Sequence, residues 1–179
     1  MSRFRRAAVW AVAMLFALWP GPAAAASGLA TFVHEQLRFS IEYPNGWTPI
    51  IGSGVALAIV GPPVAGSESF RMNVVVTVEP VLTGVSEDAL FEAEESQLRA
   101  ILPAFQLAVR EIVHVGGMRA ALRHYTWERT GGLAIYQMQL SAVAHGRVYT
   151  VTGTTLAGSP HLVHEVRLLT SIILTFRLL

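Results

Sequence analysis

The sequence contains neither cysteine nor lysine. Without cysteine it has no disulfide, no thiolate metal site and no attachment point for a lipid anchor. It also lacks two of the nucleophiles that covalent enzymes use. All 13 basic residues are arginine, and 12 carboxylates nearly balance them. This balance argues against nucleic acid as a partner, because neutralising phosphates requires a basic surplus gathered in a patch.

Familiar catalytic motifs are missing as well. No G-x-S-x-G elbow occurs, and Gly52-Ser53-Gly54 lacks the downstream helix of a phosphate-binding loop. His124 and Glu128 fall on the same face of a predicted strand but lie about 13 Å apart along it, too far for a hydrogen-bonded dyad. The sequence therefore predicts neither an enzymatic activity nor a cofactor.

Residues 1–26 have the three-part layout of a secretory signal peptide. Three arginines lie within the first six residues, residues 7–19 are uncharged and mostly apolar, and a run of alanines ends at Ala26. The apolar run is shorter than the ~20 residues of a membrane-spanning helix. We therefore expect cleavage, leaving residues 27–179 as one soluble domain with no membrane span, located in the periplasm or secreted.

The first half of this domain carries three strand patterns. Apolar and polar residues alternate over residues 37–43 and over residues 71–79, and residues 55–60 read as a short buried strand. Residues 27–36 are predicted to be an irregular lead-in. Residues 64–69 are predicted to be a polar loop.

A helix is predicted between Ser86 and Pro103. Ser86 is a good N-cap, acidic residues follow where the helix dipole favours them, and Pro103 cannot continue a helix. The predicted sheet-facing stripe consists of Leu90, Ala93, Leu98, Ile101 and Leu102. The predicted water-facing residues are Glu94, Glu95 and Arg99, of which the last two are spaced for an i,i+4 ion pair.

Four strand patterns follow, at residues 105–115, 118–128, 133–144 and 147–155. One or two glycines separate each from the next, which predicts hairpin turns and an antiparallel meander.

A last helix is predicted from Ser159 and Pro160 onward, with Ser159 as its N-cap. Its predicted apolar stripe consists of Leu162, Val166, Leu169, Ile173 and Phe176. The element order is then βββ-α-ββββ-α. This order predicts an α+β fold, an αβα sandwich whose mostly antiparallel sheet has about seven strands.

The segment from Phe39 to Trp47, which reads FSIEYPNGW, resembles the opening of the PsbP-like family, which includes PsbP and bacterial exported proteins of the DcrB type. The element order resembles that family over most of the domain. The resemblance implies an αβα sandwich and a non-enzymatic role in binding, assembling or stabilising a partner in or near the cell envelope. It carries no catalytic residue across, because the family shares none.

Five side chains are candidates for a binding surface. Pro44 and Gly46 suit a turn, so Trp47 either closes one end of the core or stacks on a ligand. A predicted strand face of arginine and aromatic residues could likewise bind a partner or pack beneath a helix. The candidates are Tyr43, Trp47, Arg123, Tyr125 and Trp127.

His161, His164 and Glu165 are weak candidates for a metal site. Two imidazoles three residues apart on a helix, with an adjacent carboxylate, could hold zinc. A solvated helix face explains them equally well, and H-x-x-H-E matches no common zinc-protease motif.

Three functions follow from these patterns. The leading hypothesis is an exported, non-enzymatic module that binds an envelope or periplasmic protein. The second is a carrier of an apolar ligand such as a lipid, suggested by the 53% apolar content. The third is a metal-dependent hydrolase that uses the two histidines and Glu165.

Overall fold

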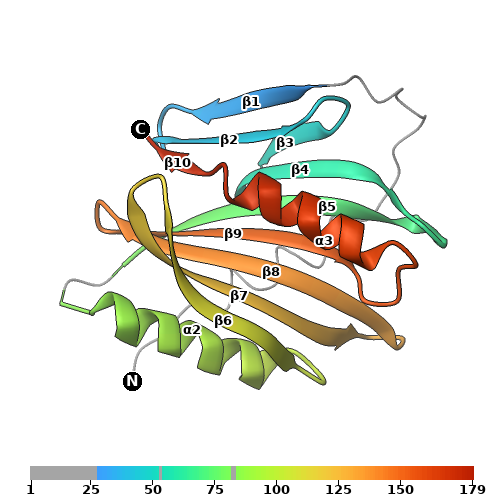
Figure 1. The fold of residues 1–179 in the computed structure, drawn as a ribbon. Coiled ribbons are helices and arrows are strands. Elements are labelled where there is room, and N and C mark those ends of the chain that lie inside the picture. The colour runs from blue at the N-terminus through green and yellow to red at the C-terminus, as the bar shows by residue number, and fades with distance from the viewer. Residues whose placement is uncertain (1–27, 53, 82–83) are drawn as a thin grey trace.

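The computed structural model describes residues 28–52, 54–81 and 84–179, so the predicted signal peptide at residues 1–26 lies outside the described residues. Ten strands and two helices follow one another in this part of the chain (Figure 1). They are β1 (Leu29–His34), β2 (Phe39–Pro44), β3 (Thr48–Gly52), β4 (Val55–Val64), β5 (Ser67–Pro80), α2 (Glu87–Ile101), β6 (Gln106–Val115), β7 (Met118–Arg129), β8 (Leu133–Ala144), β9 (Arg147–Leu156), α3 (Leu162–Ile173) and β10 (Arg177–Leu178). Neither described helix is long and apolar enough to cross a membrane.

Seven strands form the large sheet, in the order β3-β4-β5-β9-β8-β7-β6. Every neighbouring pair is antiparallel. The predicted meander is confirmed as β6 to β9, and the bounds of β8 coincide with the prediction. Glycine at the turns explains this success, because Gly116, Gly117 and Gly146 all adopt the positive φ that tight hairpins require.

A second sheet of three strands, β1-β2-β10, lies beside the large sheet (Figure 1). The prediction of an irregular lead-in at residues 27–36 is wrong, because Leu29–His34 form β1 and pair with β2. The sequence pattern did not predict β1, because Phe32 and Val33 lie on opposite faces of the strand and are both apolar, so polarity does not alternate. Val33 is 45% exposed.

The prediction of a polar loop at residues 64–69 is also wrong. Strand β4 runs to Val64 and β5 begins at Ser67, so the connection is a tight hairpin. The prolines before it suggested a break, yet Pro63 pairs with Arg71. Register shifts on both sides of Pro63 accommodate it, as bulges commonly do for proline in a sheet.

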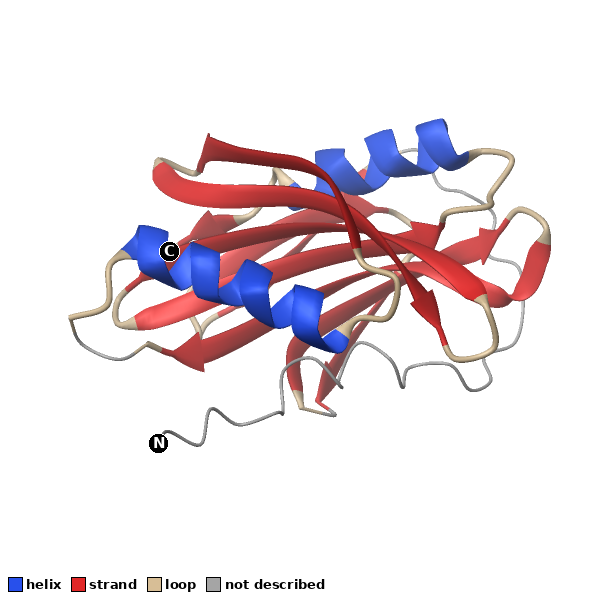
Figure 2. Ribbon diagram, turned by 90° about the horizontal axis from the view of Figure 1, so that it is seen from below, coloured by secondary structure: helices blue, strands red, loops and turns tan. Residues whose placement is uncertain are grey.

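Helix α3 covers one face of the large sheet (Figure 2). Leu169, Ile173 and Phe176 of the predicted stripe are fully buried. The approach is close, because a Cβ added at Gly153 of β9 would lie 3.0 Å from Ile173 Cδ1. The predicted N-cap is displaced: the cap residue is His161, and its side chain makes no capping bond. Ser159 Oγ instead donates a hydrogen bond to Glu165.

Helix α2 covers the opposite face of the sheet. Arg123 of β7 contacts α2, and its cross-strand partner is Gln139. Met138, the neighbour of Gln139, contacts α3. Side chains at successive strand positions point to opposite faces, so the sheet separates the two helices. The predicted αβα sandwich is therefore confirmed.

The helix α2 has the predicted ends but not the predicted face. Ser86 is the N-cap, and its Oγ accepts a hydrogen bond from the backbone N–H of Ala89 at 3.2 Å. The buried residues are Phe91 and Leu98, whereas Ile101 is 44% exposed. Glu94, predicted to face water, contacts the sheet instead. The physical reason lies in Arg123, described below.

Trp47 closes one end of the apolar core. Gly46 has a φ of 87°, and the N–H of Trp47 donates to Pro44 O at 3.2 Å, so the predicted turn is present. The indole then lies against Gly61 of β4, where an added Cβ would come within 2.6 Å of Trp47. Glycine at this position is what lets the ring approach the strand.

Gly61→Ala should therefore lower the free energy of unfolding by about 1–3 kcal/mol, the usual cost of overpacking a core. Urea unfolding followed by tryptophan fluorescence measures this change. Gly158→Ala is the matched control, because its new Cβ would meet nothing within 4 Å. Equal stability of the two variants would contradict the assignment of Trp47 to the core.

Candidate functional site

The five side chains proposed as a binding surface are mostly buried. Tyr43 is 8% exposed, Trp47 is 9% exposed, and both belong to the apolar core. Arg123 and Tyr125 are fully buried, and Trp127 is partly buried against the same core. The structure therefore divides them between the core beside Gly61 and the sheet face that α2 covers.

Arg123 fixes α2 to the sheet. Its Nη2 donates to the backbone oxygen of Phe91 at 2.6 Å, and its Nη1 donates to Glu94 Oε2 at 3.3 Å. The guanidinium carbon also lies 5.9 Å from the centre of the Phe91 ring. A buried arginine is costly unless its donors are used, so the helix turns Glu94 towards it. This requirement explains why the acidic side of α2 faces the sheet.

The aromatic residues next to Arg123 make structural contacts of their own. Tyr125 stacks on Phe105 with ring centres 5.1 Å apart, and burial raises the pKa of its phenol. Trp127 Nε1 donates to Gln137 Oε1 at 2.8 Å, and Gln137 Nε2 donates to Thr154 Oγ1 at 3.1 Å. This face of the sheet is therefore held by a polar network as well as by packing.

We expect Arg123→Met to lower the free energy of unfolding by about 3–5 kcal/mol, because it leaves the Glu94 carboxylate without its buried partner. Urea unfolding measures the change. Arg119→Met is the control: Arg119 forms ion pairs with Glu87 and Asp88 at the surface, where such pairs contribute little. A similar loss in both variants would contradict the role assigned to Arg123.

The stability that Arg123→Met loses should also depend on pH. Burial raises the pKa of Glu94 above its ordinary value of 4.5, and the charge of Arg123 opposes that rise. Without Arg123 the pKa rises further. A carboxyl group with a raised folded-state pKa contributes stability below its ordinary value and loses it as pH increases through the raised value. Arg123→Met should therefore destabilise more at about pH 7 than at about pH 4.5.

The three metal-site candidates do not come together. Glu165 is buried and accepts hydrogen bonds from Thr155 Oγ1 and Ser159 Oγ. His161, the N-cap of α3, and His164 are exposed. Within the described ranges no group of three potential metal ligands occurs. The carboxylate instead ties α3 to β9 and to the loop between them.

Glu165→Ala should reduce the free energy of unfolding by about 1–3 kcal/mol, because two buried hydroxyl donors lose their acceptor. Thermal and urea unfolding both report this. His164→Ala, which changes the adjacent exposed residue, should stay within about 0.5 kcal/mol of the unmodified chain. A larger effect of His164→Ala than of Glu165→Ala would show that the histidine, not the carboxylate, organises this helix end.

His124 pairs with a partner other than Glu128. Its Nδ1 lies 3.2 Å from the hydroxyl of Tyr136, across the strand pair β7–β8. Burial lowers the pKa of His124, while the charge of Glu111 opposes this. An imidazole and a phenol without a nucleophile or a hydrogen-bonded carboxylate form no recognisable catalytic arrangement.

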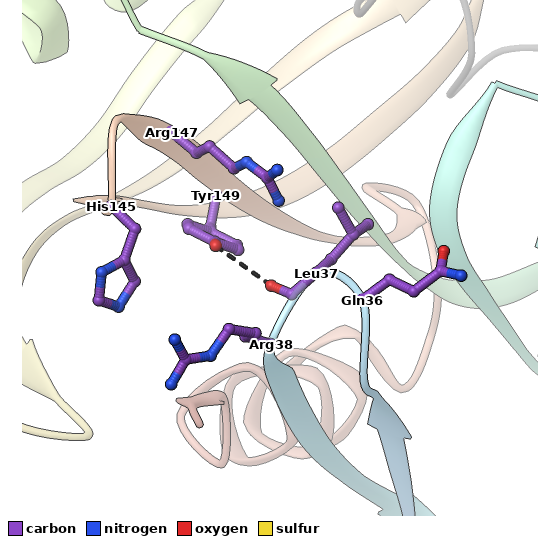
Figure 3. Close-up of a pocket in the computed structure, with 6 residues that line it drawn as sticks. All are labelled: Gln36, Leu37, Arg38, His145, Arg147 and Tyr149. Atoms are coloured by element: carbon purple, nitrogen blue, oxygen red, sulfur yellow. Dashed lines mark hydrogen bonds between the residues drawn. The ribbon is translucent and has the colours of Figure 1, made fainter.

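Sequence reasoning missed a hollow at the edge of the small sheet (Figure 3). It has a volume of about 220 Å³. We call it the basic hollow, and its lining residues are Gln36, Leu37, Arg38, His145, Arg147 and Tyr149. Tyr149 OH donates to Leu37 O at 3.1 Å and joins the two sheets there. No sequence signal marks the hollow, because two distant turns supply its residues.

The outer edge of β6 is the second exposed feature. Strand β6 pairs only with β7 among the described strands, and residues 108–112 are all exposed. Val109 and Ile112 are 39% and 44% exposed. The opposite edge, β3, is shorter and carries Pro49 and a bulge. We call the unpaired side of β6 the free edge.

A family model described as DcrB matches residues 64–161, more than half of the 179-residue chain. The chain belongs to the DcrB family. The DcrB match runs from the end of β4 to the start of α3 and includes the free edge. The PsbP-like resemblance is thereby confirmed, although the FSIEYPNGW motif lies outside the matched residues. No curated protein matches this DcrB-family sequence significantly.

Solved structures share the fold at low sequence identity. Cyanobacterial PsbP (CyanoP) from Synechocystis sp. PCC 6803 has a TM-score of 0.64 at 12% identity, covering 90% of this chain and 99% of its own. LpqN of Mycobacterium tuberculosis has a TM-score of 0.65 at 14% identity, covering 84% and 90%. The Saccharomyces cerevisiae Ran-binding protein Mog1p has a TM-score of 0.60 at 9% identity, covering 86% and 96%. These likenesses show that this chain has the same fold as those proteins.

Proposed function

We propose that this chain is an exported, non-enzymatic module that binds a protein partner of the cell envelope. Residues 1–26 supply the export signal, and residues 27–179 form the binding domain. The partner adds an extended segment to the free edge of β6.

The free edge is the observation that carries this proposal. An edge strand presents a row of N–H and C=O groups that pair with any extended backbone, so folded proteins usually blunt such edges. Here β3 has five residues, among them Pro49, whereas β6 has ten residues and no proline, and its one register shift lies near its start, between Leu107 and Val109. Its exposed Val109 and Ile112 would give a partner strand apolar contacts on both faces of the sheet.

The use of the buried polar groups also supports binding over catalysis. Arg123 and Glu94 hold α2, and Glu165 holds α3, so these groups already have structural partners. Among the similar structures, LpqN is described as involved in cell envelope biogenesis and Mog1p as Ran-binding. The first description supports an envelope context for the proposal, and the second supports a role in binding a protein.

The carrier function is less well supported by the packing. A lipid held between α3 and the sheet would need space there. Leu169, Ile172 and Phe176 fill that interface and are at most 2% exposed. A Cβ at Gly153 would lie 3.2 Å from Leu169 Cβ. The interface between α3 and the described strands is therefore occupied by the protein's own side chains.

Site-specific cross-linking in the native host tests the proposal. A photoreactive amino acid at Val109 should cross-link one protein that mass spectrometry identifies reproducibly, while the same group at Val163, which is 67% exposed on α3, should not. With the identified partner purified, hydrogen exchange of the β6 backbone amides should slow on mixing, because strand addition protects them. Unchanged exchange of β6 would overturn strand addition.

Two double variants distinguish specific binding at the free edge from nonspecific binding to exposed apolar residues. Val109→Lys with Ile112→Lys should abolish binding of the identified partner to the free edge, because lysines on an edge strand oppose strand pairing. Val163→Lys with Leu174→Lys replaces exposed apolar residues at the two ends of α3 and adds the same charge, and it should leave binding unchanged. A cross-link from β6 to a second copy of this chain would contradict the envelope partner and show that the free edge mediates self-association.

A further inference from the structure

The arginines of the described domain divide into two groups. Most have a protein partner: Arg99, Arg110, Arg119 and Arg123 lie within 4.0 Å of a carboxylate oxygen, and Arg71 and Arg177 donate to backbone oxygens. Arg38, Arg147 and Arg167 form no ion pair with any described carboxylate. Of these, Arg38 and Arg147 line the basic hollow, so this hollow has two guanidinium groups that no described carboxylate neutralises.

The turns that form the hollow hold an arginine and a histidine in a backbone conformation that favours glycine. Arg38 has a φ of 54° and His145 a φ of 51°. They are two of the three non-glycine residues with positive φ in the described ranges. Glycine would adopt this backbone at lower cost, so retaining arginine and histidine at both turns points to a use for their side chains.

The walls of the hollow are well fixed. Tyr149 is 2% exposed, and its hydroxyl is held by Leu37 O. The backbone N–H of Leu179 donates to Arg38 O at 3.0 Å, which anchors the first turn from the other side. The second turn is held where the N–H of Val81 donates to Gly146 O at 2.9 Å. The cationic side chains therefore project from positions that the backbone fixes in advance (Figure 3).

We propose that the basic hollow binds a phosphate group, with Arg38 and Arg147 as its main ligands and His145 as a third donor. Guanidinium groups match phosphate because their N–H donors form two parallel hydrogen bonds to its oxygens. A volume of about 220 Å³ accommodates a phosphate with its first ester atoms but is smaller than a typical pocket for a drug-sized molecule. The same chemistry serves free phosphate and a phospholipid headgroup.

Calorimetry and vesicle sedimentation with the full chain test the site and distinguish the two sources. Inorganic phosphate is titrated into the protein, and vesicles of phosphatidylglycerol with phosphatidylcholine are compared with vesicles of phosphatidylcholine alone. Arg38→Gln and Arg147→Gln should each weaken binding by about ten-fold. Because all variants keep residues 1–26, any membrane affinity of that segment cancels in the comparison.

Arg167→Gln is the matched control. Arg167 is exposed on α3, also has no ion pair with a described carboxylate, and loses the same charge when substituted. Loss of binding in the two hollow variants but not in Arg167→Gln supports the site. Binding of anionic vesicles without binding of inorganic phosphate assigns the headgroup, and the reverse assigns the free ion.

An equal loss of binding in all three variants would show that only the net charge of the protein matters, and it would overturn the proposal. Absence of binding to either probe in the unmodified chain would also overturn it. Circular dichroism of each variant confirms that the fold is intact. Because the hollow and the free edge use different strands, either site can fail its experiment without deciding the other.

Discussion

The structure depends on a large sheet whose two faces differ in chemistry. Along β7, β8 and β9 one face carries Leu122, Met138 and Val151, and the other carries Arg123, Gln139 and Thr152. The first face is covered by apolar side chains of α3. The second can be covered only by an element that accepts hydrogen bonds from a buried guanidinium, and α2 accepts them from the two Nη atoms of Arg123 with a carboxylate and a backbone oxygen.

This polar face explains which part of α2 was predictable. The ends of the helix follow from local chemistry, so Ser86 and Pro103 revealed them in the sequence. The orientation follows from the sheet beneath. A hydrophobic stripe predicts the buried side only when the opposing surface is apolar. Arg123 belongs to a strand that comes later in the chain, so nothing within the helix indicated that Glu94 would turn inward.

Whether the other elements could be predicted also depends on how far apart in the sequence their interacting residues lie. The hairpins of the meander are local, and glycines mark their turns, so the antiparallel order was predictable. Strand β10 has two residues and exists only because β2 lies beside it. The basic hollow has the same origin: Arg38 and Arg147 meet because the small sheet rests on the large one through Tyr149 and Leu37. Neither long-range contact leaves a periodic pattern in the sequence.

The pairing of β2 with β10 has a consequence for the order of folding. Ser40 pairs with Arg177, and the ring of Phe39 packs on Phe176 with centres 5.6 Å apart. The β1–β2 hairpin is a local contact, whereas the segment that completes its sheet must be brought from far along the chain. Until then one side of β2 stays unpaired and Phe39 lacks its aromatic neighbour. The small sheet is therefore completed by a contact between segments that lie far apart in the sequence.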